Sequence, residues 1–259
     1  RERARNADTF STDESGEWQE ISNGKHSVFV GYETREQKTE VRKIRSEGEG
    51  IALLLAETPF YGESGGQVGD KGVIVGKDFT INITDTQKEG DMILHLGKWI
   101  KGDNISNPQV TATVEKEQRK STERNHTATH ILHKVLKEVL GEHVNQSGSL
   151  VEPKRLRFDF THYNPITREE LDEIEKRVNE AVREDMEVDN FITTLEEAKE
   201  QGAVALFGEK YEDKVRVLKI DDFSMELCGG THIFRTGEIG YFRITHEEGV
   251  AAGVRRIEA

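Results

Sequence analysis

The sequence lacks the features that would tie the chain to a membrane or to an oxidising compartment. Its longest apolar run, Ile51 to Ala56, is far shorter than the roughly 20 residues that a spanning helix needs. The charged opening, Arg1 to Asn6, is not followed by an apolar segment, so we expect no secretory signal peptide. Cys228 is the single cysteine, so no intramolecular disulfide can form. We therefore expect no membrane association and a reducing, cytoplasmic location.

An excess of positive charge is also missing. Lys and Arg number 36 against 49 Asp and Glu, which gives a formal net charge of −13, and both halves of the chain are acidic. This balance argues against non-specific nucleic-acid binding, so any RNA contact must come from local basic clusters. The apolar fraction of 34% still suffices for a globular core. Because no initiating Met is present, we expect the chain to be a piece of a longer protein.

The sequence pattern changes near Thr113. Before this point, short segments rich in β-branched residues are separated by Gly, Asn or Asp, which is typical of an antiparallel barrel or sandwich. The predicted strands are His26–Tyr32, Lys38–Ser46, Ile51–Glu57, Lys71–Gly76, Phe79–Thr86, Met92–Gly97 and Val110–Val114. We expect Arg1 to Asp8 to be the tail of a helix.

After Thr113, helical periods alternate with strand-like runs. Glu115 to Leu140 is predicted as one helix closed by Gly141, Thr167 and Glu170 form a capping box that starts a second, and Leu195–Gln201 is a short third. The predicted strands are Leu156–Phe160, Val188–Thr193, Val215–Ile220, Met225–Leu227, Tyr241–His246 and Val254–Ile257. The fold class is thus predicted to be α+β, with one domain at 1–113 and another at 114–259.

Two histidines on the first long helix are candidate metal ligands. His126 and His130 are four residues apart, so both imidazoles lie on one helix face, roughly opposite the apolar stripe. His133 lies on the same face and makes the pair less distinctive. For an HxxxH pair alone, two solvated histidines are the more common outcome.

The only cysteine strengthens the metal hypothesis. Cys228 and His232 are four apart, and the intervening Gly229 and Gly230 disfavour a helix, which leaves a loop that can wrap a cation. One thiolate and three imidazoles form a borderline-soft ligand set suited to Zn²⁺. A lone cysteine is more often a small buried apolar residue, but the joint pattern is far less expected by chance. We therefore expect these four side chains to converge on one Zn²⁺ site.

These motifs resemble the editing region of the alanyl-tRNA synthetase family over nearly the whole chain. The resemblance is carried by His126-Thr-Ala-Thr-His130, Asn145-Gln-Ser-Gly-Ser-Leu150, Leu156-Arg-Phe-Asp-Phe160, Cys228-Gly-Gly-Thr-His232 and the segment Gly249 to Ala259. Phe60-Tyr-Gly-Glu-Ser-Gly-Gly-Gln67 is similar to the glycine motif of the preceding β-barrel in that family. Free-standing alanyl-tRNA editing proteins and the threonyl-tRNA synthetase editing domain share both the HxxxH and CxxxH pairs.

The resemblance implies an N-terminal antiparallel β-barrel followed by a two-layer α+β editing domain. It also implies hydrolysis of Ser-tRNA(Ala) and Gly-tRNA(Ala), without an aminoacylation domain in this segment. Editing has a physical reason. A pocket built for alanine rejects glycine or serine only weakly, because a difference of one methylene-sized group is worth only about 1–3 kcal/mol. A free-standing editing protein and a non-catalytic tRNA-binding module with a structural zinc are the alternatives.

The role of the zinc ion stays open at the level of sequence. It could lower the pKa of a bound water, polarise the ester carbonyl or only orient the substrate. A catalytic zinc keeps an open position that four protein ligands would close. One of the four residues would then be a loose ligand, or the ion would become five-coordinate.

Four further residues are candidates for the reaction itself. Gln146 follows the helix end and could orient the water or the amino acid, although a surface amide is the plainer interpretation. Thr129, Ser147 and Ser149 are hydroxyls that could read the substrate serine; helix or turn hydrogen bonding is the alternative. A serine nucleophile is disfavoured because no GxSxG motif surrounds them.

Local basic clusters are the candidates for tRNA contact. These are Lys154, Arg155 and Arg157, followed by Arg255 and Arg256. Arg155 and Arg157 alternate on a predicted strand and should face the same side. Ordinary solvated surface is an equally good interpretation, given the acidic total.

Overall fold

The computed structural model describes residues 16–204 and 213–259, so the predicted helix tail at Arg1 to Asp8 lies outside the described residues. Contacts divide the chain into two compact units. Unit 1 comprises Arg1–Ser64 and Val68–Gln118, and unit 2 comprises Gly65–Gln67 and Arg119–Ala259. The fold class is α+β, as predicted. No helix among the described residues is long and apolar enough to cross a membrane.

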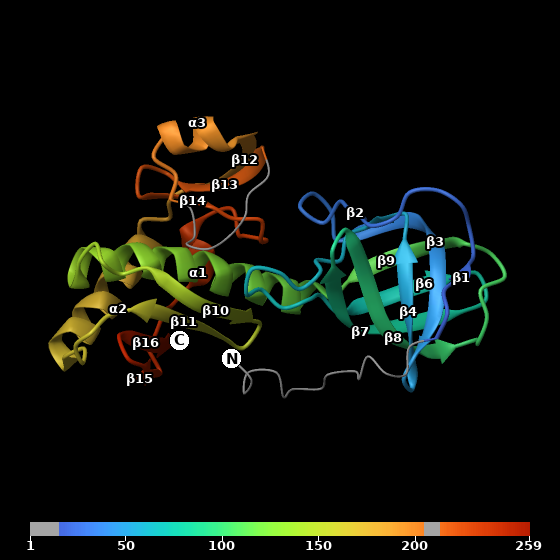
Figure 1. The fold of residues 1–259 in the computed structure, drawn as a ribbon, viewed down its shortest axis with the longest axis horizontal. Helices are drawn as coiled ribbons and strands as arrows, with labels where there is room; N and C mark the ends of the chain where they lie inside the picture. The colour runs from blue at the N-terminus through green and yellow to red at the C-terminus, as the bar shows by residue number, and fades with distance from the viewer. Residues whose placement is uncertain (1–15, 205–212) are drawn as a thin grey trace. The chain divides into compact units, whose positions relative to one another are not determined.

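Unit 1 is built on a closed antiparallel β-barrel (Figure 1). Its strands follow the order β3 (Glu36–Glu47), β4 (Gly50–Leu55), β8 (Met92–Lys101), β7 (Thr80–Glu89), β6 (Gly72–Gly76) and β9 (Gln109–Val114). Pairing of β9 back onto β3 closes the ring, which leaves no unpaired sheet edge among these strands. Alternate residues such as Val110, Ala112 and Val114 are buried, so the strand period of two fills the core.

Shorter strands complete unit 1. β1 (Gln19–Glu20) extends the sheet beside β3, and β2 (Val28–Phe29) pairs in parallel with β5 (Glu57–Thr58). The predicted strand His26–Tyr32 is thus much shorter in the structure. Ser27 has a φ of 64° and breaks the extended run just before β2.

Unit 2 is organised around α1 (Lys116–Leu140), whose final residues and Gly141 cap agree with the sequence prediction. One sheet contains β10 (Gln146–Glu152), β11 (Arg155–Thr161), β16 (Val254–Glu258) and β15 (His246–Ala251). The second contains β12 (Val188–Thr194), β13 (Lys214–Ile220) and β14 (Ser224–Leu227). In Figure 1, α1 runs between the two sheets, and the main core joins Leu132 of α1 to Phe158 and Leu218.

Both shorter helices start at a capping box, of which only the one at Thr167 was predicted. α2 (Arg168–Arg183) starts at a complete Thr167–Glu170 capping box, and α3 (Leu195–Glu200) starts at a second box made by Thr194 and Glu197. The short 3₁₀ helix η2 (Thr236–Ile239) follows β14. Each cap satisfies helix N–H groups that would otherwise lack a partner.

Two strand assignments were wrong. Tyr241–His246 was predicted as a strand, but only His246 belongs to one, at the start of β15. The Phe242 N–H donates to Asn179 Oδ1 and the Ile244 N–H donates to Glu175 Oε2, so side chains of α2 take the place of a neighbouring strand. Conversely, β10 was not predicted, because its polar start lacks the β-branched pattern, although it pairs with β11 along its length apart from a bulge at Ser147.

Candidate metal centre

The helix histidines are buried in unit 2. His126 and His130 are 6% and 5% exposed, so the interpretation as a solvated pair is wrong. Their rings stack with centroids 5.2 Å apart, as expected for residues one helical turn apart. The polar face of α1 therefore faces protein rather than water.

The second pair comes from the loop that follows β14. The Cys228 N–H donates to Arg216 O at 3.0 Å, and the Arg216 guanidinium donates to Gly230 O at 2.7 Å, which fixes both ends of the Gly–Gly turn. Gly230 packs directly on an imidazole ring: a Cβ there would lie 2.1 Å from His126 Cε1. The absence of a side chain at this position lets the loop reach the helix.

These four residues form one cluster, as the sequence predicted. One ligand atom from each of His126, His130, Cys228 and His232 lies within 4.8 Å of the others. Cys228 Sγ is 3.5 Å from His126 Nε2, although the two residues are 102 positions apart, and 3.3 Å from His232 Nε2. We call this set the four-residue cluster.

Each imidazole of the cluster is held from its outer nitrogen. His130 Nδ1 donates to Glu226 Oε2 at 2.8 Å, and His126 Nδ1 contacts Gln67 Oε1 at 2.7 Å. His232 Nδ1 lies 3.2 Å from Thr127 Oγ1, whose own proton goes to a backbone carbonyl. This leaves the Nε2 atoms for the interior of the cluster, the arrangement common around metal-binding histidines.

Charges inside the cluster shift its pKa values in opposite directions. Burial alone raises the pKa of the Cys228 thiol, but the three imidazoles outweigh it and lower that pKa well below its usual range. Burial lowers the pKa of His232 to about 3. Burial also lowers the pKa of His130, but the Glu226 carboxylate outweighs it and raises that pKa to about 10. A thiolate and a neutral His232 are the forms in which these groups bind metals.

The residues present fit a zinc ion. His130 Nε2 is buried and has no hydrogen-bond partner among the described residues, which is costly unless this atom gives up its proton and binds a metal ion. Three imidazoles and a thiolate match the donor preference of Zn²⁺. The four-residue cluster is therefore a candidate zinc site.

The other candidate reaction residues lie near α1 and on β10. Gln146 pairs with Phe160 and Ser149 pairs with Phe158, so both belong to the core-facing side of the sheet. Ser147 is exposed at the β-bulge between them. Thr129 is buried and its hydroxyl donates to Asn125 O at 2.8 Å. Among the described residues, no hydrogen bond joins these four to the four-residue cluster, and their roles stay predictions.

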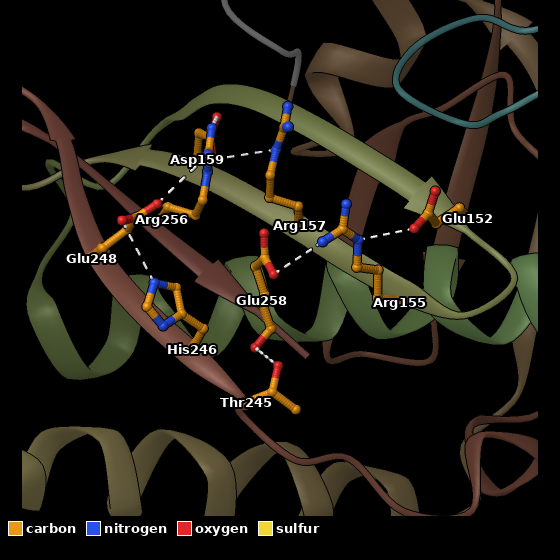
Figure 2. Close-up of polar contacts among 9 residues, drawn as sticks. All are labelled: Glu152, Arg155, Arg157, Asp159, Thr245, His246, Glu248, Arg256 and Glu258. Carbon is orange, nitrogen blue, oxygen red and sulfur yellow. Dashed lines mark hydrogen bonds and ion pairs between the residues drawn. The ribbon is translucent and has the colours of Figure 1, made fainter. Parts of the chain in front are cut away.

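Three of the candidate RNA-binding arginines, Arg155, Arg157 and Arg256, lie on strands at the outer face of the same sheet (Figure 2). Arg255 pairs with Phe160 and therefore lies on the opposite face. Arg155 and Arg157 share the outer face, as expected. Carboxylates pair with these side chains: Arg155 with Glu152 and Glu258, Arg157 with Asp159, and Arg256 with Asp159 and Glu248. Arg255 pairs with Glu247, while Lys154 occupies the exposed turn between β10 and β11. The charge of the outer face is therefore largely compensated.

Sequence reasoning missed the outer partners of the histidines. Gln67 is completely buried and Glu226 is 5% exposed, and both contact histidines of the four-residue cluster. Glu226 also accepts from His133 Nδ1 at 3.2 Å, which explains the third histidine on the α1 face. A carboxylate two residues before Cys228 on a strand was a signal for Glu226, whereas Gln67 stood only at the end of a glycine motif.

Comparisons with known proteins define the class first. A family model described as "tRNA synthetases class II (A)" matches residues 1–118, and one described as "Threonyl and Alanyl tRNA synthetase second additional domain" matches residues 215–258. The second match covers the loop of Cys228 and His232. Barrel and cluster thus occur in a chain related to class II tRNA synthetases.

Individual relatives then identify the family. The chain is 46% identical over its full length to an alanine–tRNA ligase of Legionella pneumophila and 49% identical to that of Methylococcus capsulatus. Over 89% of its length it is 50% identical to the alanine–tRNA ligase of a Thermoanaerobacter species. The chain belongs to the alanyl-tRNA synthetase family. It spans 31% of the length of the first two relatives.

Proposed function

We propose that unit 2 carries a hydrolytic editing site that removes serine or glycine from mischarged tRNA(Ala). The observation that carries this proposal is the buried four-residue cluster, which unites a thiolate with three imidazoles in a chain of this family. The proposed partners are tRNA(Ala) and the rest of a synthetase polypeptide, in a reducing cytoplasmic setting that keeps Cys228 free.

In the proposed mechanism, His126, His130, Cys228 and His232 hold Zn²⁺. When bound, the ion supplies a positive charge that polarises a substrate oxygen or acidifies water. The chain's own residues position the ester: Gln146, on the core-facing side of β10, orients the attacking water through its amide. Lys154, Arg155, Arg157, Arg255 and Arg256 are the proposed contacts to the tRNA backbone.

The experiment is deacylation of Ser-tRNA(Ala), Gly-tRNA(Ala) and Ala-tRNA(Ala) by the purified chain. Cys228→Ala should abolish hydrolysis of the first two while the circular dichroism spectrum is kept. Ser224→Ala, at the start of strand β14 that precedes Cys228, is the matched control and should remain active. Unchanged hydrolysis by Cys228→Ala contradicts the proposal.

A non-catalytic tRNA-binding module is the second candidate. It is favoured by one observation, that four protein side chains lie within ligand reach, because four-coordinate zinc sites are usually structural. This candidate requires that the zinc-loaded chain binds tRNA(Ala) without deacylating it. The same assay, read together with tRNA binding, separates the two functions.

We predict that one hydroxyl sets the preference for serine. Leaving a buried polar partner unpaired against the alanine methyl costs about 1–3 kcal/mol, or roughly tenfold to a hundredfold in rate. Thr129→Val, Ser147→Ala and Ser149→Ala are the test variants, and the responsible one should lower the ratio of Ser-tRNA to Ala-tRNA hydrolysis while Gly-tRNA changes less. The donor of Thr129 is already used by Asn125 O, so this residue can only accept from the substrate. Three unchanged ratios would exclude all three residues.

A further inference from the structure

We propose that Gln67 is a positioning residue of the four-residue cluster, which fixes the tautomer of His126 and thereby the affinity for the metal. This inference rests on the proposed zinc site but not on the proposed hydrolysis. Gln67 is completely buried, and the helix that carries His126 begins 49 residues after it in the chain.

The hydrogen bonds of Gln67 determine which of its amide atoms faces the imidazole. Thr231 N–H, which can only donate, lies 3.0 Å from Gln67 Oε1, so that atom must be the amide oxygen. On the other side, Gln67 Nε2 donates to Thr231 Oγ1 at 2.9 Å. Thr231 therefore fixes the amide through both of its ends.

The tautomer of His126 follows from this orientation. An amide oxygen can only accept, so His126 Nδ1, at 2.7 Å, must carry the proton and donate it. The lone pair is then on Nε2, the atom 3.5 Å from Cys228 Sγ. Gln67 thus presents His126 to the cluster in the form that binds a metal.

Two glycines make room for this contact. A Cβ on Gly66 would lie 2.8 Å from Ser149 O, and a Cβ on Gly230 would lie 2.9 Å from Gln67 Oε1. The segment is held beside β10 by the Val151 N–H, which donates to Gly66 O at 2.7 Å, and Gly66 has a φ of 87°. Gly66 and Gly230 therefore allow the segment before Gln67 and the Cys228–His232 loop to approach their neighbours closely.

Among the three residues that contact the outer nitrogens of the cluster histidines, Gln67 is the one far from any ligand in the sequence. Thr127 lies on α1 itself and Glu226 lies two residues before Cys228, so both accompany a ligand pair in the sequence. Gln67 instead comes from a stretch 59 positions before His126. Loss of such an outer contact typically lowers metal affinity by about 10–100-fold.

The test measures Zn²⁺ affinity of the purified chain by competition with a chromophoric chelator, together with the visible spectrum of the Co²⁺-loaded form. Gln67→Leu should weaken Zn²⁺ binding by about 10–100-fold and alter the Co²⁺ bands. Gln67→Glu should stay within a few-fold of the original chain, because a carboxylate oxygen accepts from His126 Nδ1 and the Thr231 N–H in the same way, while its second oxygen accepts from the Thr231 hydroxyl. Gln87→Leu, on β7 of unit 1, is the control and should bind normally.

The thermal unfolding temperatures of the metal-free variants show whether Gln67 positions His126 for the metal or only stabilises the fold. A role in positioning predicts that Gln67→Leu and Gln67→Glu differ more in Zn²⁺ affinity than in metal-free stability. The inference is overturned if Gln67→Leu binds Zn²⁺ like the original chain, or if Gln67→Glu and Gln67→Leu lose affinity equally. It is also overturned if the original chain binds no Zn²⁺. If Zn²⁺ binding depends on Gln67 but the chain does not deacylate Ser-tRNA(Ala), the inference stands and the proposed hydrolysis is rejected. If the chain deacylates Ser-tRNA(Ala) but Zn²⁺ binding does not depend on Gln67, the proposed hydrolysis stands and the inference is rejected.

Discussion

At the scale of single residues, Gly229 and Gly230 are neighbours with opposite surroundings. A Cβ on Gly230 would overlap the His126 ring at 2.1 Å, while a Cβ on Gly229 would meet nothing within 4 Å. We predict that Gly230→Ala displaces the ring, costs about 1–3 kcal/mol of stability and weakens Zn²⁺ binding at least tenfold. Gly229→Ala should leave both quantities unchanged. Chelator competition and denaturant unfolding provide the measurement, and equal behaviour of the two variants would contradict the assigned packing.

His95 gives unit 1 a pH dependence. Its ring is completely buried between Thr58 Oγ1 and Leu53 O, and burial lowers its pKa to about 4. The unfolded chain protonates this residue near pH 6.5, so the unfolded state binds more protons as the pH falls from 6.5 to 4. The free energy of unfolding should therefore decrease in this window, by about 3 kcal/mol at 1.36 kcal/mol per pKa unit.

Denaturant unfolding followed at several pH values between 7 and 4 tests this prediction. His95→Gln keeps one donor and one acceptor but cannot titrate, so its stability should decline less over the same window. The difference between the two slopes isolates His95 from the carboxylates, which titrate in both proteins. Parallel slopes would show that the imidazole is not the cause.

At the scale of elements, α2 holds a segment that has no sheet partner. Asn179 accepts from the Phe242 N–H at 3.0 Å and donates to Phe242 O at 2.8 Å. Asn179→Ala leaves these buried backbone groups unpaired, and we predict a loss of about 1–3 kcal/mol. Glu180→Ala, on the exposed face of the same helix, should change stability by less than about 0.5 kcal/mol. Equal losses, measured by urea unfolding, would mean that the segment is not held in this way.

The sequence predicted elements whose signal is local. The span of α1, the cap of α2 and most barrel strands follow from periodicity and capping residues that lie within a few positions of each other. The α3 cap was not predicted, although its Thr194–Glu197 pair has the same local form. The segment 241–245 and β10 were missed, because the partners that define them are far away: Asn179 and Glu175 for the first, β11 for the second. The cluster was predictable from its ligand types, but Gln67 depends on contacts with Thr231 that no local pattern reports.

At the scale of the whole chain, the two units can be followed separately. Both tryptophans, Trp18 and Trp99, belong to unit 1, whereas α2 and α3 belong to unit 2. We predict that a chelator lowers the unfolding temperature seen by circular dichroism and leaves the tryptophan fluorescence transition in place. Zn²⁺ at a thousand times its dissociation constant should contribute about 4 kcal/mol to the first transition. A common shift of both signals would show that the units unfold together.

The wide spacing of the ligands along the chain also bears on how the centre forms during synthesis. His126 and His130 lie on one helix. Cys228 follows His126 by 102 positions, and Gln67 precedes His126 by 59 positions. Contacts of such long range are formed only after the entropy of closing a long loop has been lost, and they slow folding. A nascent chain that has not yet reached Cys228 therefore holds two of the four ligands and no complete centre. Metal uptake becomes a late event, which couples loading of the ion to completion of unit 2.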